Sequence, residues 1–197
     1  MDTRLGSGVT NQDQRQLLIT AAMSIAAAGV AITVMLAVLS GRALSAQDKY
    51  TVQVPNGLAF SEFRGYEDWQ TIAVSQSEDL IEVILGNPLI IDAYRAGIPG
   101  NGKPFPDGAK MAKIHWKAKK SEEAPAPTTV PDVLHDVDFM VKDSKRFPDS
   151  GGWGYAQFNY DGASDTFTPE GTGADCGFAC HTIVEKKDYV FTSYGKR

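Results

Sequence analysis

Two cysteines and a histidine near the C-terminus are the residues whose types and spacing point most directly to chemistry. Cys176, Cys180 and His181 form the pattern C-x-x-x-C-H, and the chain of 197 residues has no other cysteine and only two other histidines. In the related pattern C-x-x-C-H, the two thiols attach a haem covalently and the histidine ligates its iron. The cluster therefore predicts a haem attachment site, with one residue more than usual between the thiols.

Two other interpretations of this cluster stay open from the residues alone. Thiol pairs in an oxidising compartment often form disulfides, which requires α-carbons roughly 4.4–6.8 Å apart. A structural zinc site needs about four ligands, and the sequence offers no second Cys/His cluster to complete one. Haem is the favoured interpretation, with a Cys176–Cys180 disulfide as the first alternative.

An uncharged, mostly aliphatic run lies between Arg15 and Arg42. About 20 apolar residues can cross a bilayer as a helix. The run predicts either a secretory signal cleaved near Ala46 or a retained anchor, because it is longer than the apolar core of a usual signal. Either way we expect residues 47–197 to be a periplasmic domain, with residues 1–46 as signal peptide or inner-membrane anchor.

The exported part is acidic. The chain has 19 Lys and Arg against 24 Asp and Glu; three and two of these lie in residues 1–46, which leaves 16 against 22. An acidic domain without a basic cluster is not expected to bind nucleic acid. Its length fits one domain with a hydrophobic core of its own.

Hydrophobic patterning in this domain predicts several short strands and two helices. Helices are expected over residues 66–74 and after Asn87, which is the N-cap, with Pro88 at the first helical position and Gly97 as the stop. The expected strands cover residues 79–85, 109–117, 132–141 and 153–160, and residues 48–54 are expected to form a first strand or an extended arm. The pattern is typical of an α+β fold, mainly an antiparallel sheet or open barrel with a few short helices, preceded by the N-terminal apolar helix.

Alternation within two of these strands assigns side chains to faces. One face of 109–117 carries Ala112, Ile114 and Trp116, and the other Met111, Lys113 and His115. In 132–141, Val137, Phe139 and Val141 alternate with Asp136, Asp138 and Met140. Two polar sets therefore alternate with two apolar ones.

Three blocks of the sequence resemble the cytochrome P-460 family and its relative cytochrome c′-beta. They are residues 105–113 (FPDGAKMAK), residues 141–147 (VKDSKRF) followed by Gly152-Trp153, and Cys176–His181 followed by DYVFT at 188–192. The resemblance implies a small, mainly antiparallel β domain, usually dimeric, with one covalently attached haem c whose iron is five-coordinate.

The same resemblance implies roles for individual residues. His181 is the iron ligand, and Cys176 and Cys180 are the attachment thiols, with Cys180 the stronger candidate because it adjoins the ligand. Lys113 aligns with a lysine that P-460 proteins cross-link to the porphyrin edge. Asp138 aligns with a pocket carboxylate that accepts a proton in hydroxylamine-oxidising members, although it is one methylene shorter than glutamate.

Each of these roles has a plainer alternative. Lys113 would otherwise be a solvated strand lysine, and Asp138 an exposed carboxylate. His115 and His135 are expected to be surface or structural residues rather than second axial ligands. Met111 and Met140 are expected on the pocket wall. Phe139 is expected in the core, although the c′-beta branch uses a phenylalanine over the iron to restrict its ligands, and Phe105 is another candidate for that role.

Three functions follow from these readings. The first is an oxidoreductase that oxidises hydroxylamine or nitric oxide, passes electrons to a periplasmic acceptor and acts as a homodimer. The second is a nitric oxide-binding module of the c′-beta type without turnover. The third is a haem-free exported β domain with a Cys176–Cys180 disulfide.

Overall fold

The computed structural model describes residues 47–55, 57–170 and 173–197, with side chains from residue 177 onward in the last range. Within this part of the chain, no helix is long and apolar enough to cross a membrane. The expected signal or anchor, residues 1–46, lies outside the described residues, and so does the side chain of Cys176.

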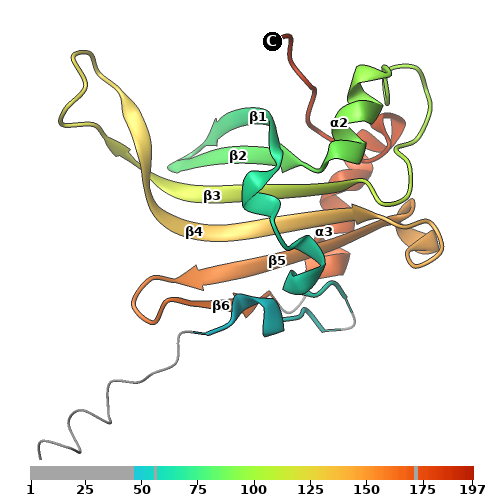
Figure 1. Cartoon of the computed structure of the whole chain (residues 1–197), viewed down its shortest axis with the longest axis horizontal. Coiled ribbons are helices and arrows are strands. Elements are labelled where there is room, and N and C mark those ends of the chain that lie inside the picture. Colours follow the sequence, from blue (N-terminus) through green and yellow to red (C-terminus); the bar gives the residue numbers. More distant parts are fainter. Residues whose placement is uncertain (1–46, 56, 171–172) are drawn as a thin grey trace, which may run out of the picture. The chain divides into compact units, whose positions relative to one another are not determined.

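The domain is built on one antiparallel sheet whose six strands are neighbours in the order of the sequence (Figure 1). The strands are β1 (Gln70–Ser77), β2 (Leu80–Gly86), β3 (Lys110–Lys120), β4 (Thr129–Lys142), β5 (Trp153–Asp161) and β6 (Thr166–Pro169). The α-helices are α2 (Pro88–Arg95) and α3 (Gly173–His181), with 3₁₀ turns η1 (Lys49–Thr51), η2 (Phe60–Phe63), η3 (Tyr66–Asp68), η4 (Pro148–Ser150) and η5 (Thr182–Lys187). The expected antiparallel sheet with few short helices is confirmed.

Helix α2 begins as its sequence predicts. The Asn87 side chain accepts a hydrogen bond from the Ile90 amide at 3.1 Å, which caps the helix, and Pro88 occupies the first position. Gly97 follows the helix with φ 88°, a left-handed conformation that favours glycine. The helix buries Ile90, Ile91 and Ala93, whereas Leu89 is 39% exposed.

The expected helix over 66–74 is wrong. The segment is instead η3 followed by strand β1, because β-branched residues favour a strand and Thr71 and Val74 pair with β2. Of the two interpretations of residues 48–54, the strand is not formed: the segment has η1 and a single bridge between Gln53 and Ala59. The short strand β6 carried too little periodicity to be predicted.

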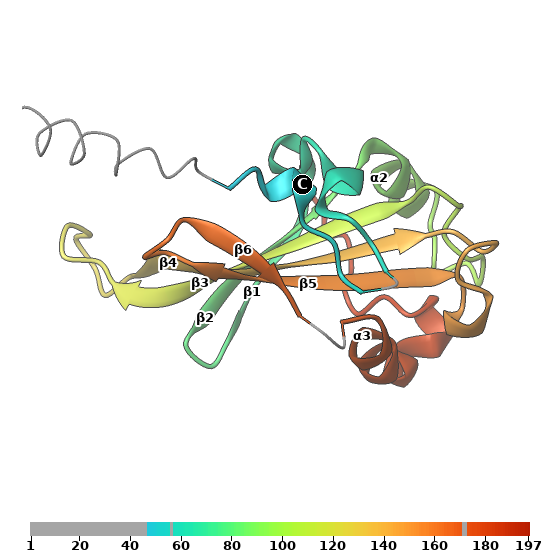
Figure 2. The same cartoon turned by 90° about the horizontal axis from the view of Figure 1, so that it is seen from below.

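The sheet has two different faces, here called the packed face and the site face. On the packed face, residues 52–66 cover an aromatic core, and Phe60 contacts the rings of Phe139, Phe158 and Phe167. The site face carries Met111, Lys113, Asp138 and Tyr155 and is partly covered by α3 and the C-terminal segment. Figure 2 shows the η1–η3 segment and α3 on opposite sides of the sheet.

Candidate functional site

Strand register assembles the site face into rows across the sheet. Directly opposite residues of an antiparallel pair bring their side chains within contact distance. The first row is Gly86, Met111, Met140 and Tyr155; the second is Ile84, Lys113, Asp138 and Gln157; the third is Glu82, His115, Asp136 and Asn159. An apolar row therefore lies beside two polar ones.

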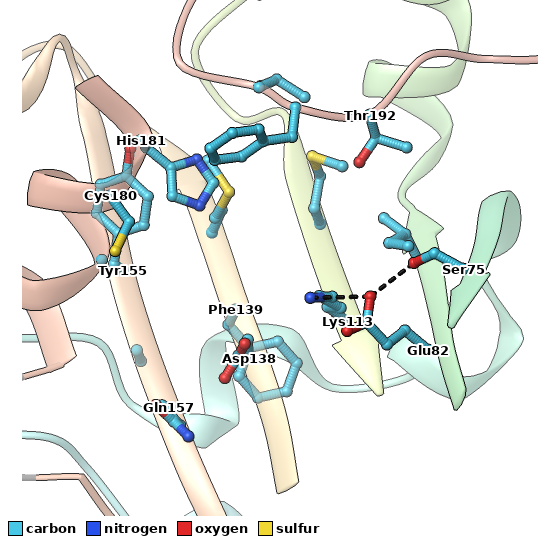
Figure 3. Close-up of a pocket in the computed structure, with 17 residues that line it drawn as sticks. Ser75, Glu82, Lys113, Asp138, Phe139, Tyr155, Gln157, Cys180, His181 and Thr192 are labelled. Atoms are coloured by element: carbon cyan, nitrogen blue, oxygen red, sulfur yellow. Dashed lines mark hydrogen bonds and ion pairs between the residues drawn. The ribbon is translucent and has the colours of Figure 1, made fainter. Parts of the chain in front are cut away.

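A cavity of about 470 Å³ lies over the first two rows, between the sheet, α3 and the C-terminal segment. This volume falls within the range of pockets that hold small molecules and cofactors. In Figure 3, Cys180, His181 and Tyr155 gather at one end of the cavity, and Lys113, Asp138 and Glu82 at the other. The side chains that make its wall apolar are Ile84, Met111, Met140, Val190 and Phe191.

A glycine lets α3 approach the sheet closely enough to bring its end to the cavity. A Cβ placed on Gly177 would lie 2.7 Å from the Cβ of Tyr155, closer than side-chain carbons pack. Gly177 therefore allows α3 to pack directly on β5. The two residues that follow it on the cavity wall, Cys180 and His181, are part of the sequence cluster.

The imidazole of His181 is held in the form that ligates a metal. Its Nδ1 donates to the Tyr189 carbonyl at 2.5 Å, which leaves Nε2 free. The ring packs against the rings of Tyr155 and Phe191, with 5.0 Å between ring centroids in each pair. Burial lowers the pKa of His181, and the charge of Lys113 lowers it further. The hydrogen bond to the Tyr189 carbonyl offsets part of this shift. A neutral ring with one nitrogen hydrogen-bonded to a carbonyl is the usual state of a metal-ligating histidine.

The segment that orients His181 is anchored by a buried ion pair. Asp188 has φ 51° and its carboxylate accepts from Lys142 Nζ at 2.6 Å and from the Phe105 amide at 2.7 Å. Its carbonyl accepts from Trp153 Nε1 at 2.9 Å. Sequence reasoning missed these positioning roles, although the DYVFT block that contains Asp188 signalled that the segment matters.

At the other end of the cavity, Lys113 points to Glu82. Its Nζ lies 3.1 Å from Glu82 Oε2, which also accepts from the Ser75 hydroxyl at 2.6 Å. Burial alone would raise the pKa of Glu82, but the hydrogen bonds from Ser75 and Lys113 outweigh it and lower the pKa. Glu82 therefore remains a carboxylate that holds Lys113 at the cavity wall.

Asp138 is the carboxyl group of the cavity with the strongest reason to hold a proton. Burial, followed by the nearby charge of Asp136, raises its pKa to about 6. Its Oδ1 is buried without a hydrogen-bond partner, while the side chain as a whole remains 37% exposed. An unpaired carboxyl of this kind suits proton transfer near neutral pH.

The cavity is lined by buried polar atoms without a hydrogen-bond partner as well as by side chains that can ligate a metal. Within the described residues, two buried side-chain polar atoms lack a hydrogen-bond partner, Asp138 Oδ1 and the Tyr155 hydroxyl, and both residues line the cavity. Buried polar groups are normally paired, so these two are expected to meet a bound group. With the Cys180 thiol, the free nitrogen of His181 and the apolar wall, the residues fit a haem.

Other candidates from the sequence lie elsewhere. His115 and His135 do not line the cavity, and Phe105 is buried against Tyr94 and Trp153 instead. Phe139 touches the cavity, but its ring stacks on Phe63 at 4.1 Å within the packed face. The expected aromatic cap is therefore not supplied by Phe105.

The cavity residues missed from the sequence include Glu82, Tyr155, Gln157 and Phe191. Alternation in β2 and β5 was visible, but it could not give the register that brings Glu82 and Gln157 beside Lys113 and Asp138.

The fold and the site together define a β-sheet protein with a cavity suited to a porphyrin and its axial histidine. Comparison with protein families identifies this class. The family model Cytochrome P460 matches residues 63–192, which is more than half of the chain. The chain therefore belongs to the Cytochrome P460 family and is a haem-binding cytochrome. A search of curated proteins finds no match.

Proposed function

We propose that this cytochrome is an exported mono-haem c-type protein that oxidises hydroxylamine or nitric oxide at a five-coordinate iron. The observation that carries the proposal is the polarity of the cavity. His181 presents a free ring nitrogen at one end, and Lys113 and Asp138, with its raised pKa, lie at the other. A cavity for gas binding alone does not need a proton-accepting carboxyl group.

Attachment of the haem is assigned to α3. Cys180 and Cys176 would form the thioethers and His181 would ligate the iron, as the resemblance implies. Since neither His115 nor His135 lines the cavity, neither competes for the second axial position. That placement supports an iron with one open coordination site.

The bound haem would supply an iron centre that binds the nitrogen species and takes up its electrons. Asp138 accepts the proton that the substrate loses, because with a pKa of about 6 it is mainly ionised at neutral pH. The ion pair with Glu82 keeps Lys113 at the cavity wall, where the proposal includes its covalent link to the porphyrin edge. The apolar side chains limit access of water.

Export, location and partners belong to the same proposal. The uncharged run between Arg15 and Arg42 supports export to the periplasm, with residues 1–46 as signal peptide or anchor. A periplasmic electron acceptor and a homodimer are proposed from the family resemblance.

The test is turnover of the haem-loaded protein with hydroxylamine or nitric oxide and ferricyanide as electron acceptor. We expect substrate-dependent reduction of ferricyanide, and a slower reaction for Lys113→Arg, which keeps the charge but not the primary amine. Asp132→Asn, an exposed change on the neighbouring strand β4, is the control. A protein that binds nitric oxide spectroscopically but oxidises neither substrate would replace this proposal with the c′-beta type of function.

A further inference from the structure

A row of ionisable side chains lies beside the cavity, and two of them, His115 and Asp136, have no part in the function proposed so far. Glu82, His115 and Asp136 are directly opposite one another on β2, β3 and β4. They are 7%, 6% and 3% exposed, respectively. Burying three such groups is costly unless they are paired, so their contacts need an explanation.

His115 stands between carboxylates on several sides. Its Nδ1 donates to Asp136 Oδ1, and Asp138 Oδ2 lies 4.0 Å from the same nitrogen. Its Nε2 lies 3.7 Å from Glu82 Oε1. The ring thus connects Asp138 and Glu82, which line the cavity, with Asp136, which does not.

A β-bulge brings a second histidine to the outer side of Asp136. The register passes from His115–Asp136 to Trp116–Leu134, so His135 has no partner on β3. Bulges redirect side chains in this way. His135 Nδ1 lies 2.6 Å from Asp136 Oδ2, and the His135 side chain is 40% exposed.

Asp136 is held as a carboxylate between the two rings, where it can accept a proton. Burial would raise the pKa of Asp136, but hydrogen bonds and charges from His115 and then His135 outweigh it and lower the pKa. Two more polar side chains lie near these groups. Lys113 on β3 pairs with Glu82, and Gln157 Nε2 on β5 lies 3.5 Å from Asp136 Oδ2. An imidazole can lose a proton from one position and accept another, which suits it to a relay.

We propose that His115, Asp136 and His135 form a proton path from Asp138 to solvent. The Nδ1 proton of His115 passes to Asp136, and Asp138 gives its proton to the vacated Nδ1. Asp136 then releases a proton to Nδ1 of His135, whose Nε2 proton leaves to water. No electron moves, and Asp138, His115 and Asp136 return to their first states. The exposed His135 ring is left as its Nδ1–H tautomer, and proton exchange with water restores the Nε2–H tautomer. The 4.0 Å gap is spanned by a side-chain rotation or one water.

The path deepens the proposed function, since substrate oxidation is what delivers protons to Asp138. Its test must therefore also work without turnover. The haem-loaded protein is subjected to a light-triggered pH jump, and the infrared band of the protonated Asp138 carboxyl is followed in time. Asp138→Asn identifies the band by removing it.

The variants are His135→Gln at the exposed end and His115→Gln in the buried part, with Asp132→Asn on β4 as control. We expect the Asp138 band to respond at least about tenfold more slowly in both histidine variants. Imidazole added to the solution should restore the rate for His135→Gln, because it replaces the lost exposed ring. A merely structural role of His135 would not be rescued in this way.

If His115→Gln does not fold, His135→Gln still decides the question. A wild-type response rate in His135→Gln would overturn the path and would show that water reaches Asp138 directly. Absence of hydroxylamine and nitric oxide oxidation in the wild-type protein, with the slowed and rescued infrared response intact, would overturn the proposed function and leave the path supported.

Discussion

The two faces of one sheet differ in what they bury. On the packed face, alternate residues of β2–β5 are apolar and meet the aromatic side chains of residues 52–66. On the site face, the same strands bury Glu82, His115, Asp136 and Lys142, which are all the buried charged or histidine side chains of the described residues. Adjacent residues of one strand therefore differ in role: one packs in the apolar core and the next places an ionisable group on the site face.

The difference shows how a small sheet holds a reactive cavity. The packed face supplies apolar burial, so the site face can keep unpaired atoms and a carboxyl with a raised pKa. Such groups lower stability and are characteristic of functional sites. Substitutions on the two faces should thus separate stability from activity.

The largest expected effect is on turnover. Asp138→Asn removes the proton acceptor, so kcat should fall by about 100-fold to 10,000-fold. In the wild-type protein, the rate should rise with pH through about 6, because Asp138 must be ionised to accept a proton. Steady-state kinetics from pH 5 to pH 8 measure both, and an Asp138→Asn variant with wild-type kcat would remove Asp138 from the reaction.

On the packed face, Phe60→Ala should chiefly lower stability. The fully buried ring contacts five other aromatic rings, so the free energy of unfolding should fall by about 3–5 kcal/mol. Phe191→Ala, which removes a 47% exposed ring beside His181, is the site-face control and should cost far less. Equal losses in urea unfolding would contradict the division between the faces.

Lys142→Met tests the buried ion pair that anchors the segment bearing Tyr189. The change leaves the Asp188 carboxylate buried without its partner, and the free energy of unfolding should fall by about 3 kcal/mol. Lys117→Met breaks the exposed pair with Asp79 and should cost less than about 1 kcal/mol. Urea titrations of both variants give the comparison, and a smaller loss for Lys142→Met would argue against the anchor.

The smallest effect is a gain in stability that depends on pH. Because the pKa of Asp138 is higher in the folded protein, unfolding becomes easier as pH rises through about 6. Asp138→Asn removes this penalty, and the gain at pH 7 should be on the order of 1 kcal/mol because the side chain is partly exposed. Unfolding curves at pH 4 should show almost no difference, and a loss of stability at pH 7 would contradict the raised pKa.

Much of the sheet could be predicted because side-chain alternation has a fixed period of two. The faces assigned to Lys113, His115, Asp136 and Asp138 agree with the structure for this reason. The expected helix over 66–74 was wrong because Ile72 fits both a helical and a strand pattern, and only pairing with β2 decides between them.

The site could be predicted less completely than the fold. The sequence pointed to His181, Cys180, Lys113 and Asp138, whose side chains line one cavity. It could not place Glu82 or Tyr155, because strand register depends on contacts between distant segments. The bulge that redirects His135 was likewise invisible, since it arises from pairing and not from composition.

The most direct test of the account is the intact mass of the protein, with peptide mapping, after export in a host that matures c-type cytochromes. We predict one haem-sized increment on the peptide that contains Cys180 and His181, with the Lys113 peptide joined to the same porphyrin. A protein without the increment, in which Cys176 and Cys180 have together lost two hydrogens, would contradict a covalent haem in this cavity.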